Sequence, residues 1–499
     1  MISINPLNNK KYKIPDKLDD KKHIDDFLKN NKNKKVVLVQ GLGFVGSVMS
    51  LVCANSLSEN YAVIGVDLPN ESSYWKIKSI NEGFFPIKSS DKKVDVFFKN
   101  ARKKNNFYAT YDNYSYSKAD IIIININLDV QKNSNFYADI KNYDVDLNPF
   151  TNSIKIISKN CKEDVIILVE STVPPGTCQK LIYPIFKTEF KNRRLNLNKL
   201  KLGHSYERVM PGPDYINSIQ NFYRVYSGID KKSEKSIEKF LKTIISTDNY
   251  PLTKLSNTNA TEMSKVLENS YRSMNIAFMV EWSRFAENAN VNLYEVIDAI
   301  KMRPTHSNMM FPGIGVGGYC LTKDPLLASW SKKNIFKRNE GLSQSEKAVE
   351  INDKMPLEAF NFLKSEINLE SIENLNILLL GVSYRSEVSD TRYTPVEQLY
   401  NYLSSENCKI KLHDPYVNFW EEKKIYIKDN IDKLFKDNFD VIVFCTSHNY
   451  YKNSKKLINL ILSQKKLFIL DTVGVLKNNE INILKTKFTV RVLGRGDIN

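Results

Sequence analysis

The 499-residue sequence is poor in the residues that build disulfide scaffolds and metal sites. It has six cysteines without a CxxC pair and five histidines without metal-ligand spacing. These absences argue against a disulfide framework and against a bound metal, and they predict reduced thiols. The cysteines are Cys53, Cys161, Cys178, Cys320, Cys408 and Cys445.

Long hydrophobic runs are also absent. No apolar stretch reaches the ~18 residues that a membrane helix needs. The polar stretch from Asn8 to Lys35 has no signal-peptide core. We therefore expect a cytoplasmic protein without a membrane partner. Residues 1–34, rich in Lys, Asn and Asp, are expected to form a loosely ordered polar extension.

The charge balance is basic, since Lys+Arg minus Asp+Glu is 72 − 56 = +16. Such a balance favours anionic partners, among them nucleic acid, a dinucleotide or a nucleotide sugar. The lysines are scattered along the chain and form no basic stripe interleaved with aromatic residues. We therefore expect no nucleic-acid partner.

The chain is long enough for two or three domains. From Lys35 to residue 252, apolar strands alternate with helical stretches, which predicts a parallel, doubly wound sheet. Its predicted strands are Lys35–Gln40, Ala62–Asp67, Ala119–Asn127, Val165–Glu170 and Arg224–Gly228. Alternation resumes in residues 369–499, where a second Rossmann-like domain is expected, with strands at Leu375–Leu380, Lys409–His413, Asp440–Cys445 and Leu467–Asp471.

The intervening residues 253–368 read as helical. Asn257–Asn288 contains no Gly or Pro and repeats apolar residues at helical spacing, which predicts one long helix. Further helices are expected at Leu293–Lys301 and Ser343–Lys364, the latter interrupted near Pro356. The predicted fold is therefore α/β, with two Rossmann-like domains joined by a long-helix central domain that also suits a homodimer interface.

The first chemical motif is GLGFVG, formed by Gly41, Leu42, Gly43, Phe44, Val45 and Gly46. It stands between a predicted strand and a predicted helix, and Asp67 ends the next strand 21 residues after Gly46. This context predicts a dinucleotide site, with the diphosphate at the helix N-terminus and Asp67 on the adenosine ribose. The charge of Asp67 would repel a 2′-phosphate, so NAD is favoured over NADP.

The second motif is PGIGVGGYCLTKD at 312–324. Its glycines can bring the backbone close to a ligand. Cys320 is expected to open a helix, where a thiolate is favoured, with Asp324 one turn further on. A lone cysteine is usually a small buried hydrophobe, and we assign that structural role to the other five.

These motifs resemble the UDP-glucose/GDP-mannose dehydrogenase family over roughly residues 35–499. ESTVPPGT (170–177), ERVMPG (207–212), EMSKVLENSYRSMNIA (262–277), LLGVSYRSEVSDTRYTP (379–395) and HDP (413–415) follow in the family's order. The resemblance implies two hydride transfers from C6 of a nucleotide sugar to NAD, through a cysteine thiohemiacetal and thioester that water hydrolyses. The implied catalytic residues are Cys320 (nucleophile), Lys265 (oxyanion), Asn269 (amide donor), Asp324 (water or base) and Glu170.

The same resemblance assigns binding residues. Thr172 and Arg392 match cofactor positions, in addition to residues 41–46 and Asp67. The implied substrate contacts are Arg208, Val209, Lys265, Asn269, Arg272, His306, Gly317, Tyr384 and Arg385. The Tyr-Arg-x-x-Asn pattern after Asn269 is more similar to the branch that acts on N-acetylated UDP-hexosamines, which serves polysaccharide biosynthesis.

Three positions depart from the family pattern. Tyr319 stands where a His usually precedes the cysteine, Asn127-Leu128-Asp129 replaces a Thr-Pro-Thr cofactor loop, and Val473 replaces a basic residue. They indicate either a shifted sugar preference or reduced activity. UDP-glucose 6-dehydrogenase, a nucleotide-sugar-binding protein with weakened catalysis and a two-electron hydroxyacid dehydrogenase therefore remain alternatives.

Overall fold

The computed structural model describes residues 1–87, 89–132, 142–209, 212–367, 372–427 and 430–498. The chain divides into two compact units. The first comprises residues 1–129, 145–266 and 330–339, and the second comprises residues 130–144, 267–329 and 340–499. Helices α9 (Thr258–Asn288) and α11 (Asp324–Asn334) contribute residues to both.

The first unit contains an eight-stranded sheet in the order β12-β11-β10-β9-β6-β3-β4-β5. Neighbouring strands are parallel except β10 and β11. The strands are β3 (Lys35–Gln40), β4 (Tyr61–Val66), β5 (Phe107–Thr110), β6 (Ile121–Ile124), β9 (Ile166–Val169), β10 (Lys201–His204), β11 (Val225–Gly228) and β12 (Thr253–Lys254). From β5 to β10 this is the dinucleotide-binding order 3-2-1-4-5-6, which reverses between β3 and β6.

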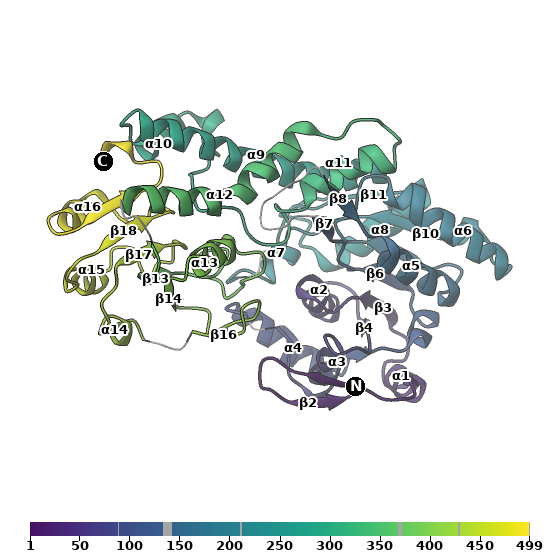
Figure 1. The fold of residues 1–499 in the computed structure, drawn as a ribbon. Helices are drawn as coiled ribbons and strands as arrows, with labels where there is room; N and C mark the ends of the chain where they lie inside the picture. Colours follow the sequence, from purple (N-terminus) through teal and green to yellow (C-terminus); the bar gives the residue numbers. More distant parts are fainter. Residues whose placement is uncertain (88, 133–141, 210–211, 368–371, 428–429, 499) are drawn as a thin grey trace. The chain divides into compact units, whose positions relative to one another are not determined.

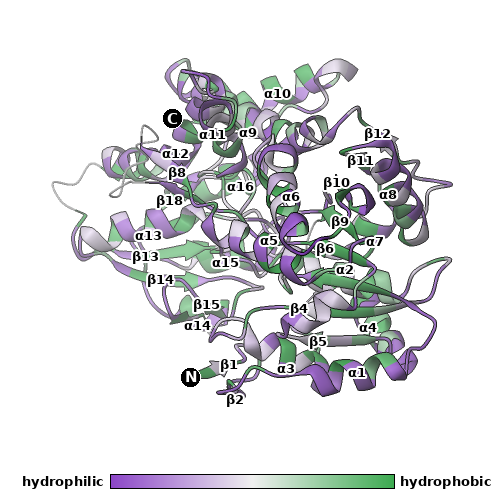
Figure 2. Ribbon diagram, turned by 90° about the vertical axis from the view of Figure 1, so that its right-hand side faces the viewer, coloured by the Kyte–Doolittle hydropathy of each residue, from purple (hydrophilic) through white to green (hydrophobic). Residues whose placement is uncertain are grey.

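Both faces of this sheet are buried, which explains the unbroken apolar strands. Val37 and Val39 of β3 join one hydrophobic core, and Val36 and Leu38 join the other. Figure 1 shows α2 beside β3 and β4, and Figure 2 shows the sheet strands as largely hydrophobic. The covering helices are α2 (Phe44–Ala54), α3 (Tyr74–Glu82), α4 (Lys92–Lys104), α5 (Asn148–Asn160), α6 (Tyr183–Asn192), α7 (Asn217–Gln220) and α8 (Lys231–Ile244).

The expectation of loose order for residues 1–34 is wrong. They form a hairpin, β1 (Ile2–Ile4) and β2 (Lys11–Lys13), followed by α1 (Lys21–Lys29). Ile24 and Phe27 of α1 pack into the core of the first unit. Ser3 donates a hydrogen bond to the carbonyl of Glu71. The prediction failed because it rested on the polar composition of residues 1–34, whereas a few apolar side chains are enough to bury the segment.

The second unit contains a parallel five-stranded sheet in the order β14-β13-β17-β18-β19. The strands are β13 (Asn376–Leu380), β14 (Lys409–His413), β17 (Val441–Phe444), β18 (Phe468–Asp471) and β19 (Thr489–Val492). Its helices are α13 (Pro395–Ser405), α14 (Ile431–Leu434), α15 (Lys455–Leu462) and α16 (Asn478–Lys485). This is the doubly wound order 2-1-3-4-5, whose reversal lies between β13 and β17.

The remaining elements of the second unit are helices and short ladders. The helices are α10 (Leu293–Lys301), α12 (Ser343–Ile367) and the short helices Pro304–His306 and Gly496–Ile498. The ladders are β7 (Val130–Lys132) with β8 (Tyr143–Val145, whose last residue belongs to the first unit) and β15 (Phe419–Trp420) with β16 (Ile425–Tyr426). The expected interruption at Pro356 does not occur: α12 is continuous, with Pro356 buried inside it. Packing of α12 against α13 stabilises the turn despite the missing N–H. The expected domain boundary at 368–369 lies outside the described residues.

Candidate functional site

In the first unit, the GLGFVG motif forms the turn between β3 and α2. Gly41 has φ +93°, and a Cβ there would meet the Asn125 carbonyl oxygen at 2.4 Å, so only glycine fits. A Cβ on Gly46 would meet the Gly41 oxygen at 1.8 Å, which explains the close packing of helix on strand. A Cβ on Gly43 would meet nothing within 4 Å. The space before the N-terminus of α2 is therefore open to a diphosphate, and the residues present fit NAD.

Asp67 follows β4 beside this turn. Its Oδ2 accepts a hydrogen bond from the backbone N–H of Leu42 at 3.1 Å and lies 3.3 Å from Nζ of Lys76. The carboxylate therefore lies next to the GLGFVG turn, as expected for a ribose-binding acid. Lys76, on α3, was not expected from the sequence because nothing in its local pattern places it beside Asp67.

Lys265 is buried in the first unit. Its ammonium donates to the backbone oxygen of Glu207 at 2.9 Å and lies 5.3 Å from the ring centroid of Tyr206. The guanidinium of Arg208 lies over the same ring at 5.7 Å, and the backbone N–H of Val209 donates to the side chain of Glu207. Three predicted residues, Lys265, Arg208 and Val209, thus lie together around Tyr206 and Glu207. Met210 and Pro211 of the same motif lie outside the described residues.

Glu170 is fully buried after β9, in an ion pair with Arg224. Its other oxygen accepts a hydrogen bond from the side chain of Asn125 at 2.9 Å. This arrangement ties the ends of β6 and β9 to the start of β11. Thr172 is half-buried two residues further on.

A second buried carboxylate, Glu262, holds the turn that follows Thr172. It accepts backbone hydrogen bonds from Gly176 at 2.6 Å and Cys178 at 2.8 Å. Burial raises its pKa to about 7, although these hydrogen bonds oppose the shift. Glu262 precedes Lys265 by one turn of α9, so it ties that part of the helix to the turn. The sequence alone gave no reason to select it.

In the second unit, exposure distinguishes Cys320 from the other five cysteines, of which four are buried and Cys408 is half-buried. Burial raises the pKa of Cys53 to about 12 and the pKa values of Cys161 and Cys408 to about 11. It also raises those of Cys178 and Cys445. Those five thiols are held protonated, and Cys320 is the accessible nucleophile candidate.

We expected Cys320 to open a helix, but it does not. Helix α11 begins at Asp324, and the Cys320 carbonyl accepts the backbone N–H of Asp324 at 2.9 Å. The thiol therefore lies in the turn before the helix. Of the four glycines that precede Cys320 in the motif, Gly315 has φ +147° and Gly318 has φ +77°, conformations that do not continue into a helix.

Asp324 is fully buried and paired on both sides. Its Oδ2 accepts a hydrogen bond from the side-chain amide of Asn269 at 2.6 Å, and its Oδ1 lies 2.8 Å from Nζ of Lys323. Lys323 is itself buried and lies 5.1 Å from the ring centroid of Tyr319. The structure brings together the predicted Asn269 and Asp324 and adds Lys323, the chain neighbour of Asp324, to which no sequence motif had assigned a role.

The glycine loop before Cys320 packs on the segment that follows β13. A Cβ on Gly317 would meet Cβ of Tyr384 at 2.5 Å, and the backbone N–H of Gly318 donates to the Arg392 carbonyl at 3.1 Å. The pKa of Tyr384 is raised mainly by burial, and the charges of Arg392 and Arg385 oppose the shift. The loop before Cys320 therefore lies against Tyr384 and the backbone of Arg392, and Arg385 follows Tyr384 in the chain. The Arg392 guanidinium makes a bidentate contact to Asp390.

Two predicted substrate residues stand outside the hydrogen-bond network of Asp324. Arg272 and His306 are exposed, on α9 and on the short helix Pro304–His306 respectively. Among the residues described, no group of three His, Cys, Asp or Glu could hold a metal ion. Likewise, no described helix has the length and hydropathy needed to cross a membrane.

The three departures from the family pattern are accommodated by packing. Leu128 is buried in the core of the first unit. Tyr319 stacks edge-on against Tyr393, with ring centroids 5.5 Å apart. Val473 packs against both cores of the second unit. Each of these three side chains therefore packs against other residues of its own unit, and the contacts of Cys320 and Asp324 described above are retained.

Comparison with known proteins matches three successive domains of one family. The UDP-glucose/GDP-mannose dehydrogenase family matches with its NAD binding domain at residues 35–245, its central domain at 259–354 and its UDP binding domain at 378–478. A UDP-N-acetyl-D-mannosamine dehydrogenase of Methanococcus vannielii is 30% identical over 478 residues, which cover 94% of this chain and 99% of the relative.

Solved structures show the same fold. The UDP-D-ManNAc dehydrogenase of Pyrococcus horikoshii aligns with a TM-score of 0.77 and 25% identity, covering 93% of this chain and all of that one. A UDP-glucose dehydrogenase of Pyrobaculum islandicum aligns with a TM-score of 0.71 and 17% identity, covering 90% and 96% of the two chains. Because the fold is shared by enzymes named for different sugars, it does not select the sugar.

Proposed function

Because the chain belongs to the UDP-glucose/GDP-mannose dehydrogenase family, whose members are NAD-dependent oxidoreductases, we propose that it oxidises C6 of a UDP-N-acetyl-hexosamine to a carboxylate. The observation that carries the proposal is the exposed thiol of Cys320, in a glycine loop that packs on Tyr384 and contacts Arg392. UDP-N-acetyl-D-mannosamine is the first donor to test, since the Methanococcus vannielii relative bears that name.

The reaction we propose removes four electrons in two steps. NAD, held at the GLGFVG turn beside Asp67, would supply the hydride acceptor for both oxidations, so each sugar would yield two NADH. After the first oxidation, the Cys320 thiolate adds to the aldehyde and forms a thiohemiacetal. The second oxidation gives a thioester, which water hydrolyses to the carboxylate and the free thiol. The balance is one alcohol, two NAD⁺ and one water to one carboxylate, two NADH and three protons.

Five further side chains have roles in this proposal. Lys265, buried with its ammonium on the Glu207 carbonyl, would stabilise the oxyanion that forms at C6. Asp324 would hold the hydrolytic water and accept its proton, and Asn269 keeps that carboxylate in place. Tyr384 and Arg385 are proposed to hold the nucleotide diphosphate, for which a guanidinium is suited.

The test measures NADH by absorbance with NAD and UDP-N-acetyl-D-mannosamine, UDP-N-acetylglucosamine, UDP-N-acetylgalactosamine or UDP-glucose. We expect two NADH per sugar from one N-acetylated donor and loss of net turnover in Cys320→Ser. Cys408→Ser, which changes a thiol outside the loop, is the matched control and should retain activity. One NADH per sugar, or turnover in Cys320→Ser, would contradict the cysteine mechanism. Binding of the donor without NADH would indicate a binding protein.

A homodimer is part of the proposal, supported by an apolar stripe on α9 in the second unit. The spacing of these residues places them on one helix face. They are Leu267, Tyr271, Phe278, Trp282 and Phe285, which are 61%, 63%, 51%, 45% and 62% exposed. We propose that a second copy covers the stripe. Sedimentation velocity should show a dimer that Trp282→Glu weakens, and a monomeric wild type at micromolar concentration would refute this part.

We place the reaction in the cytoplasm and its uronate product in polysaccharide synthesis. The six cysteines include no CxxC pair, which is compatible with a reducing compartment. Fractionation of source cells with an antibody against the protein tests the location. Loss of an acidic surface sugar on deletion of the protein tests the role.

A further inference from the structure

We propose that His448 is a positioning residue that holds the segment Val382–Glu387 in the conformation from which Tyr384 and Arg385 engage the nucleotide sugar. The inference rests on the proposed function, because it assigns a purpose to that segment's geometry. His448 itself is fully buried, and it contacts the segment without forming part of its exposed surface.

The topology explains why His448 reaches this segment. Val382–Glu387 follows β13, and His448 follows β17, which is the neighbour of β13 on the far side from β14. The strand order reverses between β13 and β17, and ligands of doubly wound sheets bind outside the carboxyl ends of the strands at this reversal. The two loops therefore meet at the edge where a ligand is expected in the second unit.

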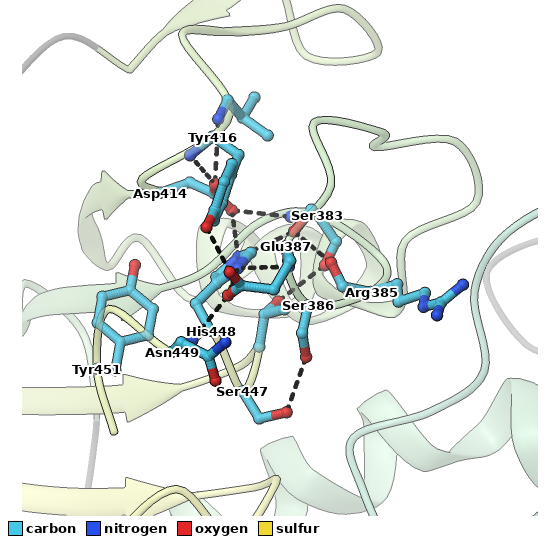
Figure 3. A network of polar contacts seen from close by, with 12 residues as sticks. Ser383, Arg385, Ser386, Glu387, Asp414, Tyr416, Ser447, His448, Asn449 and Tyr451 are labelled. Carbon is cyan, nitrogen blue, oxygen red and sulfur yellow. Dashed lines mark hydrogen bonds and ion pairs between the residues drawn. The ribbon is translucent and has the colours of Figure 1, made fainter. Parts of the chain in front are cut away.

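Both ring nitrogens of His448 contact the segment or its support. Nδ1 accepts the backbone N–H of Glu387 at 3.0 Å, which leaves Nε2 as the donor nitrogen of the ring. Nε2 faces Oγ of Ser383 at 3.0 Å and Oδ2 of Asp414 at 3.2 Å. Ser383 in turn donates its hydroxyl to the carbonyl of Arg385 at 3.0 Å. One imidazole thus fixes the backbone on both sides of Tyr384 and Arg385 (Figure 3).

The Glu387 backbone needs such an anchor. Its φ is +63°, a left-handed conformation that a non-glycine residue adopts at a free-energy cost. The hydrogen bond to Nδ1 pays part of that cost, and Glu387 Oε1 accepts a second bond from the backbone N–H of Asn449 at 2.7 Å. Without His448, the segment loses the hydrogen bond that holds the backbone of Glu387 at its end.

The rest of the network braces His448 and the start of the segment. Oδ2 of Asp414 accepts the backbone N–H groups of Val382 at 2.8 Å and Ser383 at 3.1 Å. Thr446, next to β17, donates its hydroxyl to the Ser383 carbonyl at 2.8 Å. In Figure 3 the side chain of Arg385 extends away from these contacts. The network therefore fixes the backbone and leaves the guanidinium directed outward.

The experiment uses the full-length protein with His448→Ala and His448→Asn. An asparagine oxygen occupies the place of Nδ1 and keeps the Glu387 contact but cannot reach Ser383. We expect roughly tenfold weaker UDP binding and a roughly tenfold higher KM for the sugar in His448→Ala, the loss expected for one or two buried hydrogen bonds. His448→Asn should lie between this variant and wild type. KM for NAD and kcat should change less than about threefold.

Gln464→Ala is the matched control. Gln464 is equally buried in the second unit and clamps a different loop, accepting the Phe439 N–H at 2.9 Å and donating to the Asp437 carbonyl at 3.2 Å. It should lower the thermal midpoint as much as His448→Ala does, without weakening UDP binding. Amide hydrogen exchange should accelerate in 382–387 for the His448 variants and not for the control.

A double-mutant cycle gives a second readout. Ser383→Ala removes the hydroxyl between His448 and the Arg385 carbonyl. The double variant should therefore weaken UDP binding by much less than the sum of the two single effects. Equal UDP affinity and exchange in wild type and His448→Ala would overturn the role of His448 while leaving the proposed function standing. Wild-type protein that binds no UDP and oxidises no sugar would overturn the proposed function itself.

Discussion

The side-chain amide of Asn269 donates a 2.6 Å hydrogen bond to Oδ2 of Asp324, whose carboxylate is fully buried. Asn269 lies on α9 and Asp324 begins α11, so the contact fixes the turn of Cys320 relative to the part of α9 in the same unit. An amide at 269 adds no second negative charge. Oδ1 of Asp324 instead meets the positive charge of Lys323, whose Nζ lies 2.8 Å away.

Asp324→Asn tests the hydrolytic role of this carboxylate. We expect kcat to fall by about 10²–10⁴, the range for loss of a general base. A sugar acyl group should accumulate on Cys320, visible in the intact mass. Stability should fall by about 1–3 kcal/mol, because buried Lys323 loses its partner. Asp353→Asn removes a half-buried carboxylate, paired with Lys132 at 2.6 Å, and should lower stability without acyl accumulation.

Alanine at two glycines of the GLGFVG motif should affect different properties, cofactor binding at Gly43 and stability at Gly46. Gly43→Ala adds a Cβ that meets no protein atom, at an ordinary backbone conformation of φ −81°, so stability should change by less than about 0.5 kcal/mol. The methyl group takes space from the diphosphate, so KM for NAD should rise about tenfold or more. Gly46→Ala forces a Cβ to within 1.8 Å of the Gly41 oxygen and should cost about 1–3 kcal/mol of stability. An unchanged NAD KM in Gly43→Ala would contradict the assigned cofactor site.

Asp67→Ala should shift cofactor preference toward NADP. Removing the carboxylate relieves repulsion of a 2′-phosphate and frees the Lys76 ammonium, 3.3 Å away, to attract one. The ratio of kcat/KM for NADP to that for NAD should rise at least about tenfold. Adding Lys76→Met should abolish most of this gain. A ratio that does not move in Asp67→Ala would show that Asp67 does not face the ribose.

Glu262 should make stability depend on pH. Burial raises its folded pKa from 4.5 to about 7. A group whose folded pKa is raised contributes its stability below the unfolded pKa and loses it as pH rises through the folded pKa. The difference in thermal midpoint between wild type and Glu262→Gln should therefore shift against wild type from about pH 4.5 to pH 7. Melts at half-unit pH steps measure it, and a difference independent of pH would contradict the assignment.

Much of the fold could be predicted because its signals are local. Unbroken apolar strands alternating with helices indicated two doubly wound sheets, and the strands at β3 and β14 have the expected bounds. The long helix over residues 257–288 was likewise predicted, because it contains no helix breaker. Residues 1–34 were mispredicted, since their burial depends on a few apolar side chains and on partners far away in the chain.

The sequence by itself determined which residues carry the candidate chemistry. Glycine spacing marked residues 41–46, and the glycine loop distinguished Cys320 from the other five cysteines, because backbone freedom is written in residue type. Only the tertiary structure decided which charges are paired. Glu170 meets Arg224, Asp324 meets Asn269 and Lys323, and His448 meets Glu387. Except for the neighbouring Lys323, these partners are distant in sequence. Burial, which only the fold creates, strengthens their contacts because the interior has a lower effective dielectric constant than water.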